Sequence, residues 1–255
     1  MLIDEAHDLA DEWLAAVVQM VDPATKSLLV MYDDAQSIYQ KSRRKLSFSK
    51  LGIEAQGRTE ILKINYRNTT EVLALAMECA DGILHDARAE EDMPLVIPQS
   101  AGRSGPLPTF QRFEGGLQEA AHVAGAIAEL IAQGRAPGDI AVLSPTWRSL
   151  DTMRAAIEQA GVACSPRKFD RRAPPGPPSV KLTTLHSSKG LEFPVVFVVG
   201  LDELDCSHAK RIDELRLLYV GMTRATHQLA LSAMGTSAIV DHVEQSLERV
   251  KRAYH

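Results

Sequence analysis

The sequence lacks long hydrophobic segments, a cysteine framework and an excess of positive charge. Its apolar runs all fall short of the ~18 residues that cross a bilayer, and its N-terminus turns acidic at the fourth residue, unlike a signal peptide. The three cysteines are widely spaced and odd in number, which favours reduced cytoplasmic thiols over disulfides or a zinc site. The formal net charge of −5 excludes a wholly basic nucleic-acid-binding surface but allows a local basic groove.

The sequence also contains no G-x-x-x-x-G-K-[ST] segment, the loop that cradles nucleotide phosphates. Its 255 residues, 45% of them hydrophobic, suffice for one large domain or two small ones. Apolar strand-like runs alternate with amphipathic helical segments along most of the chain, which predicts a doubly wound α/β fold. Strands are expected at 28–32, 61–64, 109–113, 140–143, 180–184, 195–199 and 228–233, and helices at 9–20, 69–84, 117–133, 149–160 and 239–250. The polar, Pro- and Gly-containing residues 85–108 are expected to form a loop or linker.

The most informative stretch runs from Val180 to Ala225. It contains TxHxxKGLEF over residues 184–193 and LLYVGMTRA over residues 217–225. Polar side chains thus emerge at the ends of buried parallel strands, where open α/β sheets bind ligands. In their order and close spacing the two strings resemble the last two ATPase motifs of UvrD/Rep-like superfamily 1 DNA helicases.

Three further motifs extend this resemblance towards the N-terminus. They are the Walker B-like DEAH at 4–7, DDxQSIY at 33–39 and NYR at 65–67. The resemblance implies a RecA-like P-loop NTPase fold, in which a parallel sheet carries helices on both faces. Residues 1–60 are expected to be a remnant of the first RecA-like domain, and residues 61–255 a nearly complete second one. A Pro-rich linker at 165–179 stands where the family's large inserted helical subdomain is absent.

The resemblance assigns one side of an ATP site to the N-terminal part. Asp4 and Glu5 correspond to the carboxylates that hold Mg²⁺ and orient the attacking water, and Gln36 to the residue that senses the γ-phosphate. The alternative for the two carboxylates is an acidic helix N-terminus. The family uses this site to drive movement along single-stranded DNA in the 3′ to 5′ direction.

The second domain is expected to supply the other side of the ATP site. By resemblance, Arg67 contacts the γ-phosphate, Tyr66 stacks on adenine, Glu192 binds the ribose hydroxyl and Arg224 is an arginine finger. Gly190 allows close approach of the backbone. The alternative for Arg67 is a surface ion pair.

A third group of residues is expected to contact DNA. Tyr39 matches the family's base-stacking tyrosine, whereas Lys41 stands where the family usually has an aromatic residue. Attraction of the basic cluster to phosphates could replace that stacking. The alternatives are a half-buried core ring for the tyrosine and a solvated loop for the cluster. The complete candidate set is Tyr39, Lys41, Arg43, Arg44, Thr184 and His186.

Two other functions compete with a complete helicase. A DEAH-type superfamily 2 RNA helicase would end in a QxxGRxGR-like motif, but this chain has YVGMTRAT there. A non-catalytic DNA- or nucleotide-binding module is the stronger alternative, because the sequence lacks the phosphate loop. We therefore expect negligible ATP hydrolysis by these 255 residues without the N-terminal half of a helicase or another chain.

Overall fold

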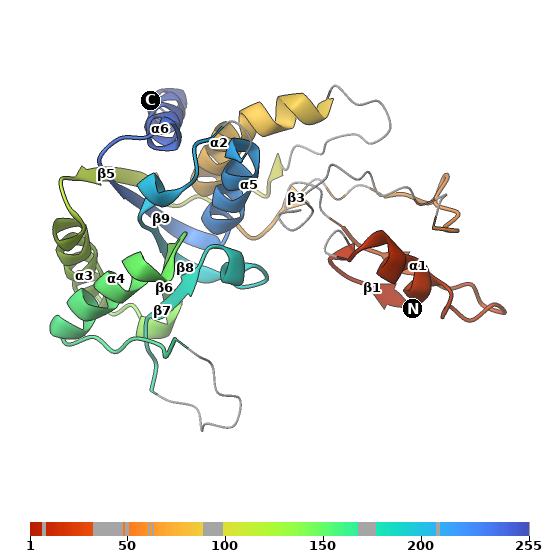
Figure 1. The fold of residues 1–255 in the computed structure, drawn as a ribbon, viewed down its shortest axis with the longest axis horizontal. Helices are drawn as coiled ribbons and strands as arrows, with labels where there is room; N and C mark the ends of the chain where they lie inside the picture. The colour runs from red at the N-terminus through yellow and green to blue at the C-terminus, as the bar shows by residue number, and fades with distance from the viewer. Residues whose placement is uncertain are drawn as a thin grey trace. The chain divides into compact units, whose positions relative to one another are not determined.

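The computed structural model describes residues 1–6, 9–32, 48, 51–60, 62, 64–88, 99–167, 177–207 and 210–254 (Figure 1). The chain divides into two compact units. Unit 1 comprises Met1–Lys63 and Asp86–Ile97, and unit 2 comprises Ile64–His85 and Pro98–His255. No helix among the described residues is both long and apolar enough to cross a bilayer.

A five-stranded parallel sheet organises unit 2. Its strands lie in the order β5 (Thr109–Phe113), β9 (Ala225–Met234), β8 (Phe193–Val198), β6 (Ile140–Ser144) and β7 (Lys181–Thr184). The interior strand β6, which lies between β8 and β7, is buried at all five positions, as expected for a parallel strand covered on both faces. The order confirms the predicted α/β class, and the sheet flanked by helices is consistent with a RecA-like domain.

Helices cover both faces of this sheet (Figure 1). α3 (Gly116–Ala132) and α4 (Trp147–Gln159) pack on one face, against alternate residues of the strands such as Val142 and Phe197. The intervening residues are also buried and point to the other face, because successive side chains of a strand alternate. α5 (Arg211–Met222) lies on that second face, where its Gly221 approaches Leu143 of β6.

Two further helices complete unit 2. α2 (Thr70–Arg88) and α6 (Ala238–Ala253) are joined by an Arg249–Glu78 ion pair, and His242 Nε2 lies 2.9 Å from the Cys79 carbonyl oxygen. Ser237 caps α6, accepting a hydrogen bond from the Val240 amide at 3.2 Å.

The segment predicted as a loop between residues 85 and 108 contains regular structure. α2 continues to Arg88, four residues beyond its predicted end, and β4 (Gln99–Ser100) pairs in parallel with β3 (Ile64–Asn65). A two-residue strand is too short to show a hydrophobic period, so the sequence pattern gave no sign of it. The pairing brings this segment beside the NYR motif.

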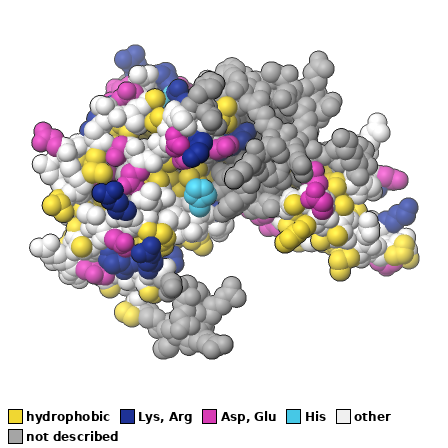
Figure 2. Space-filling model, viewed as in Figure 1, with side chains coloured by type: hydrophobic (Ala, Val, Ile, Leu, Met, Phe, Trp, Pro, Cys, Tyr) yellow, Lys and Arg dark blue, Asp and Glu magenta, His cyan; other side chains and the backbone are white. Residues whose placement is uncertain are grey.

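Unit 1 contains a much smaller core. β1 (Leu2–Ile3) pairs in parallel with β2 (Leu29–Val30), and α1 (Asp11–Val18) packs against them through Leu14. A strand does lie within the predicted range 28–32, but the expectation that it is buried was wrong, because β2 has two residues and its Leu29 is 58% exposed. Two short strands with α1 on one side leave hydrophobic side chains on the surface of this unit (Figure 2).

Replacing Gly221 with alanine is expected to destabilise the protein, although this glycine lies in a helix. A Cβ there would lie 2.3 Å from Leu185 Cδ2, and Leu185 is fully buried. Overpacking costs about 1–3 kcal/mol and outweighs the helical gain of up to about 1 kcal/mol, so Gly221→Ala should lower Tm by a few degrees in a thermal melt. The matched control is Gly125→Ala in α3, where a Cβ meets nothing within 4 Å and should raise Tm. Equal stability of the two variants would contradict this packing.

Candidate functional site

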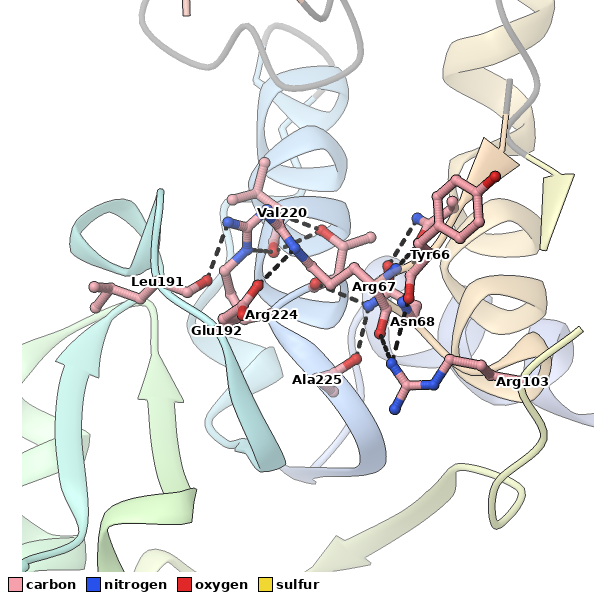
Figure 3. A network of polar contacts seen from close by, with 11 residues as sticks. Tyr66, Arg67, Asn68, Arg103, Leu191, Glu192, Val220, Arg224 and Ala225 are labelled. Atoms are coloured by element: carbon pink, nitrogen blue, oxygen red, sulfur yellow. Dashed lines mark hydrogen bonds and ion pairs between the residues drawn. The ribbon is translucent and has the colours of Figure 1, made fainter. Parts of the chain in front are cut away.

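Three predicted site residues converge in unit 2: Arg67, Glu192 and Arg224 (Figure 3). Arg67 follows β3, Glu192 immediately precedes β8, and Arg224 immediately precedes β9. Phe193 and Ala225 are paired neighbours in the sheet, so the residues just before them lie side by side. The cluster therefore occupies the amino ends of two adjacent strands, not the carboxyl ends where open α/β sheets usually bind ligands.

Arg67 and Glu192 form an ion pair. Arg67 Nε lies 2.9 Å from Glu192 Oε2, and the side chains are 43% and 59% exposed. The surface ion pair considered for Arg67 is thus present, and its partner is another candidate residue. Exposed pairs contribute about 0–1 kcal/mol, so a ligand with phosphate and hydroxyl groups can replace this contact at little cost.

Tyr66 lies next to this pair; the residue is 70% exposed, and its ring is directed away from the polar network (Figure 3). Its backbone is held from the other side, because Arg103 Nη1 donates to the Tyr66 and Arg67 carbonyl oxygens at 3.3 and 3.2 Å. The ring is therefore accessible to a flat ligand while its main chain is fixed.

Arg224 is buried, with 1% of its surface exposed. Its Nε donates to the Val220 carbonyl at 2.9 Å, and its Nη1 donates to the Leu191 carbonyl at 3.2 Å. A buried cation is tolerated only when its donors are bonded, so these contacts hold the C-terminal turn of α5 against the segment before β8. In this conformation the guanidinium faces protein oxygens. The contact with the γ-phosphate that the resemblance assigns to Arg224 stays a prediction.

Two asparagines that were given no role connect these segments. Asn65 Oδ1 accepts hydrogen bonds from the amides of Arg67 and Asn68 at 2.9 and 3.0 Å. The Asn68 side chain, 1% exposed, donates to the carbonyls of Thr223 and Ala225 at 2.9 and 2.7 Å. An Asn-x-x-Asn spacing directly before a helix was the available signal, since short amide side chains commonly bond nearby backbone.

The predicted DNA-contacting loop follows the carboxyl end of β7. Thr184 Oγ1 donates to Ser187 Oγ at 3.0 Å and accepts from the Ser187 amide at 3.3 Å, which stabilises the short 3₁₀ turn His186–Ser188. His186 and Gly190 are exposed, and Gly190 has φ +76°, a conformation that favours glycine. This loop therefore presents His186 outward from a fixed base.

Unit 1 carries the two predicted magnesium-binding carboxylates directly after β1. Asp4 is exposed, and its Oδ1 accepts the Glu5 amide at 2.9 Å. Glu5 has φ +52°, which is uncommon for a residue with a side chain and recurs at functional sites. No group of three or more metal-ligating side chains occurs among the described residues, so these offer magnesium an adjacent carboxylate pair at most. The predicted Gln36, Tyr39, Lys41, Arg43 and Arg44 lie outside the described residues.

A second polar cluster lies at the opposite, carboxyl edge of the sheet. Glu119 of α3 is 1% exposed, and its Oε1 accepts from Ser232 Oγ at 2.6 Å and from the Gly200 amide at 3.2 Å. Burial raises the pKa of this carboxyl group above its usual value, and the negative charges of Asp202 and Glu203 add to the shift. The cluster fastens α3 to β8 and β9, and no sequence motif indicated it.

Comparisons with known proteins identify the motifs around this site. Residues 166–236 match the UvrD-like helicase C-terminal domain family. The ATP-dependent DNA helicase UvrD2 of Mycobacterium tuberculosis is 25% identical over 307 residues, covering 80% of this chain and 43% of the relative. PcrA of Bacillus subtilis is 45% identical over 64 residues, 22% of this chain and 9% of the relative. Rep of Escherichia coli is 49% identical over 59 residues, 21% of this chain and 9% of the relative.

The chain thus spans less than half the length of each of these relatives. Among solved structures, the C-terminal domain of a possible DNA helicase from Lactobacillus plantarum WCFS1 is similar, with a TM-score of 0.50 and 23% identity over 72% of this chain and 96% of that chain. At this identity the likeness supports the fold alone. The matched segment 166–236 contains both strings that carried the sequence resemblance, which is thereby confirmed. Fold, motifs and relatives together show that this chain is similar to the C-terminal portion of a UvrD/Rep-like DNA helicase.

Proposed function

We propose that this chain is the C-terminal part of an ATP-dependent DNA helicase that moves 3′ to 5′ along single-stranded DNA. The observation that supports this most directly is the cluster of Arg67, Glu192 and Arg224 in unit 2, each in a helicase-like motif and each held by contacts to the others' segments. In this proposal the cluster supplies the second RecA-like domain's contacts to ATP.

The two exposed members of the cluster and the neighbouring Tyr66 each suit one part of a nucleotide. The planar Arg67 guanidinium matches phosphate oxygens, the Glu192 carboxylate can accept from a ribose hydroxyl, and the accessible Tyr66 ring can stack on adenine. Nucleotide binding then replaces the exposed ion pair between the two side chains. Arg224 contributes either by supporting this arrangement or by turning towards the γ-phosphate.

We propose that Asp4 and Glu5 serve a Mg·ATP complex. Asp4 retains one carboxylate oxygen beyond the one that accepts the Glu5 amide, and Mg²⁺ commonly binds one or two carboxylates together with substrate phosphates. In this proposal the ion would neutralise phosphate charge, and Glu5 would orient the attacking water molecule. Among the DNA-contact candidates, the outward His186 and the neighbouring Thr184 suit contact with single-stranded DNA. The three free cysteine thiols suit a cytoplasmic location.

The first test is binding of a fluorescent ATP analogue, mant-ATP, to the 255-residue chain. Arg67→Ala should weaken binding about tenfold or more, because a charged hydrogen bond to phosphate is lost. Arg148→Ala, which removes an exposed arginine from α4, is the matched control and should bind as the parent does. Equal affinity of the parent and Arg67→Ala would contradict the proposed site.

Hydrolysis separates the helicase from the alternative, a non-catalytic binding module. ATP turnover is measured with and without single-stranded oligodeoxythymidine, in the parent and in Glu5→Gln. Turnover that Glu5→Gln abolishes means that these residues form a working site, by themselves or between chains. Binding of both ligands without turnover favours the module, or a catalytic site that requires further protein.

A further inference from the structure

We propose that Asn68, held by Asn65, is a positioning residue that sets Arg67 and Arg224 relative to one another. The inference rests on the proposed nucleotide site and adds to it a residue that neither the motifs nor the relatives assign. It concerns a pair of side-chain amides, termed here the Asn65–Asn68 clamp.

In the clamp, the buried side-chain amide of Asn68 donates both of its hydrogens to the carbonyl oxygens of the two residues that flank Arg224. Asn68 Nδ2 donates to Thr223 O at 2.9 Å and to Ala225 O at 2.7 Å (Figure 3). The carbonyls lie 155 and 157 residues away along the chain, so the bonds join distant segments. Thr223 O belongs to the peptide group before Arg224, and Ala225 O to the peptide group after Ala225, so the two bonds anchor the backbone on either side of Arg224 and limit the direction of its side chain.

The other end of the clamp fixes the backbone of Arg67. Asn68 Oδ1 accepts from Asn65 Nδ2 at 2.9 Å, and Asn65 Oδ1 accepts from the Arg67 amide at 2.9 Å. Arg67 then reaches Glu192, and Arg224 reaches the neighbouring Leu191 carbonyl. Three segments, 65–68, 191–192 and 223–225, are thereby closed into one ring of contacts, so a shift of one moves the others.

Only a carboxamide satisfies this arrangement. Its nitrogen carries two donors that point at two carbonyl oxygens, while its oxygen accepts from Asn65. An aspartate has the same shape but would place an acceptor against both carbonyls, and a serine has a single donor. Because Asn68 is 1% exposed, water cannot readily replace the lost bonds.

The test compares the affinities of mant-ATP and mant-ADP for the full chain. Arg67 corresponds to a γ-phosphate contact, and Arg224 is proposed to support it or to turn towards the same group, so Asn68→Asp should lower the ATP-to-ADP affinity ratio about tenfold, the effect of losing about one charged hydrogen bond. Ser246→Ala is the control for general destabilisation: it removes a buried hydroxyl that accepts from Arg249 in α6, so it should lower Tm without changing the ratio. Asn68→Ser, which keeps one donor, should give an intermediate ratio and replaces Asn68→Asp if that variant does not fold.

Coupling to Arg67 provides the second readout. In an Arg67→Ala background the Asn68 substitution should change the ratio much less than it does alone, because the clamp then has one arginine fewer to position. A parent that binds mant-ATP while both Asn68 variants keep its ATP-to-ADP ratio would overturn the inference and leave the proposed function standing. A parent that does not bind mant-ATP would overturn both.

Discussion

Replacing Arg224 with alanine is expected to lower Tm by roughly 10 °C or more and to abolish any nucleotide turnover of the chain. The Arg224 side chain is among the largest fully buried side chains of the described residues. Its guanidinium donates to carbonyl oxygens of α5 and of the segment before β8. Alanine leaves those oxygens without this donor and opens a cavity in their place. Circular dichroism melts measure the loss of stability, and ATP-hydrolysis assays measure the loss of turnover.

Two other substitutions sharpen this expectation. Arg252→Ala removes an exposed arginine of α6 and should shift Tm little, because surface substitutions usually change stability by less than about 0.5 kcal/mol. Arg224→Lys keeps the charge but cannot reproduce the planar set of donors, so it should remain clearly less stable than the parent. An Arg224→Ala protein with the parent's Tm would show that the buried contacts contribute nothing to folding.

Glu119 is expected to give opposite results with alanine and with glutamine. Glu119→Ala leaves the Gly200 amide and the Ser232 hydroxyl buried without their acceptor, which should lower Tm by about 5–15 °C. Glutamine keeps Oε1, the atom that accepts both hydrogen bonds. It cannot carry the negative charge that burial and two nearby carboxylates disfavour. Glu119→Gln should therefore raise Tm at neutral pH.

The gain from Glu119→Gln should depend on pH in one direction. The folded pKa of Glu119 lies above its ordinary value of 4.5, so the folded state holds this proton more tightly than the unfolded state. Parent stability consequently falls as pH rises through the raised pKa, whereas glutamine has no proton to lose. The difference in Tm between the two proteins should be largest at neutral pH and shrink as pH falls towards 4.5. A difference that grows in acid would contradict the assigned burial.

Much of the unit 2 fold could be predicted from the sequence, because β6 and most of β8 are buried and strongly apolar and the helices α3 and α4 are clearly amphipathic. The predicted strand over 109–113 agrees with β5, and the helix predicted at 117–133 differs from α3 by one residue at each end. Unit 1 was harder, since its sheet of two short strands buries little and a two-residue strand has no measurable period. Side-chain bonding such as the Glu119 cluster depends on residues more than 80 positions apart, which no local pattern encodes.

The candidate site could be predicted as a set of residues but not as an arrangement. The motifs named Arg67, Glu192 and Arg224, and the fold brings them together. They did not reveal that Arg224 is buried, nor that Asn68 bonds the peptide groups around it, because both depend on how β3 and α2 pack beside the start of β9.

The segment between β7 and β8 acts as a spacer of fixed length. The strand pairing places Thr184, the last residue of β7, near the level of Val198 at the end of β8, whereas β8 begins at Phe193. Residues 185–192 therefore run back about 20 Å along the sheet and cross two strand spacings of about 5 Å each. Eight residues reach at most about 28 Å when fully extended, and three of these are coiled in a 3₁₀ turn, so the segment has little slack. At one end of the segment, Leu185 packs on Gly221. At the other end, the Leu191 carbonyl oxygen accepts a hydrogen bond from Arg224. A single deletion would detach one of these ends, so the number of residues here matters as much as their identity.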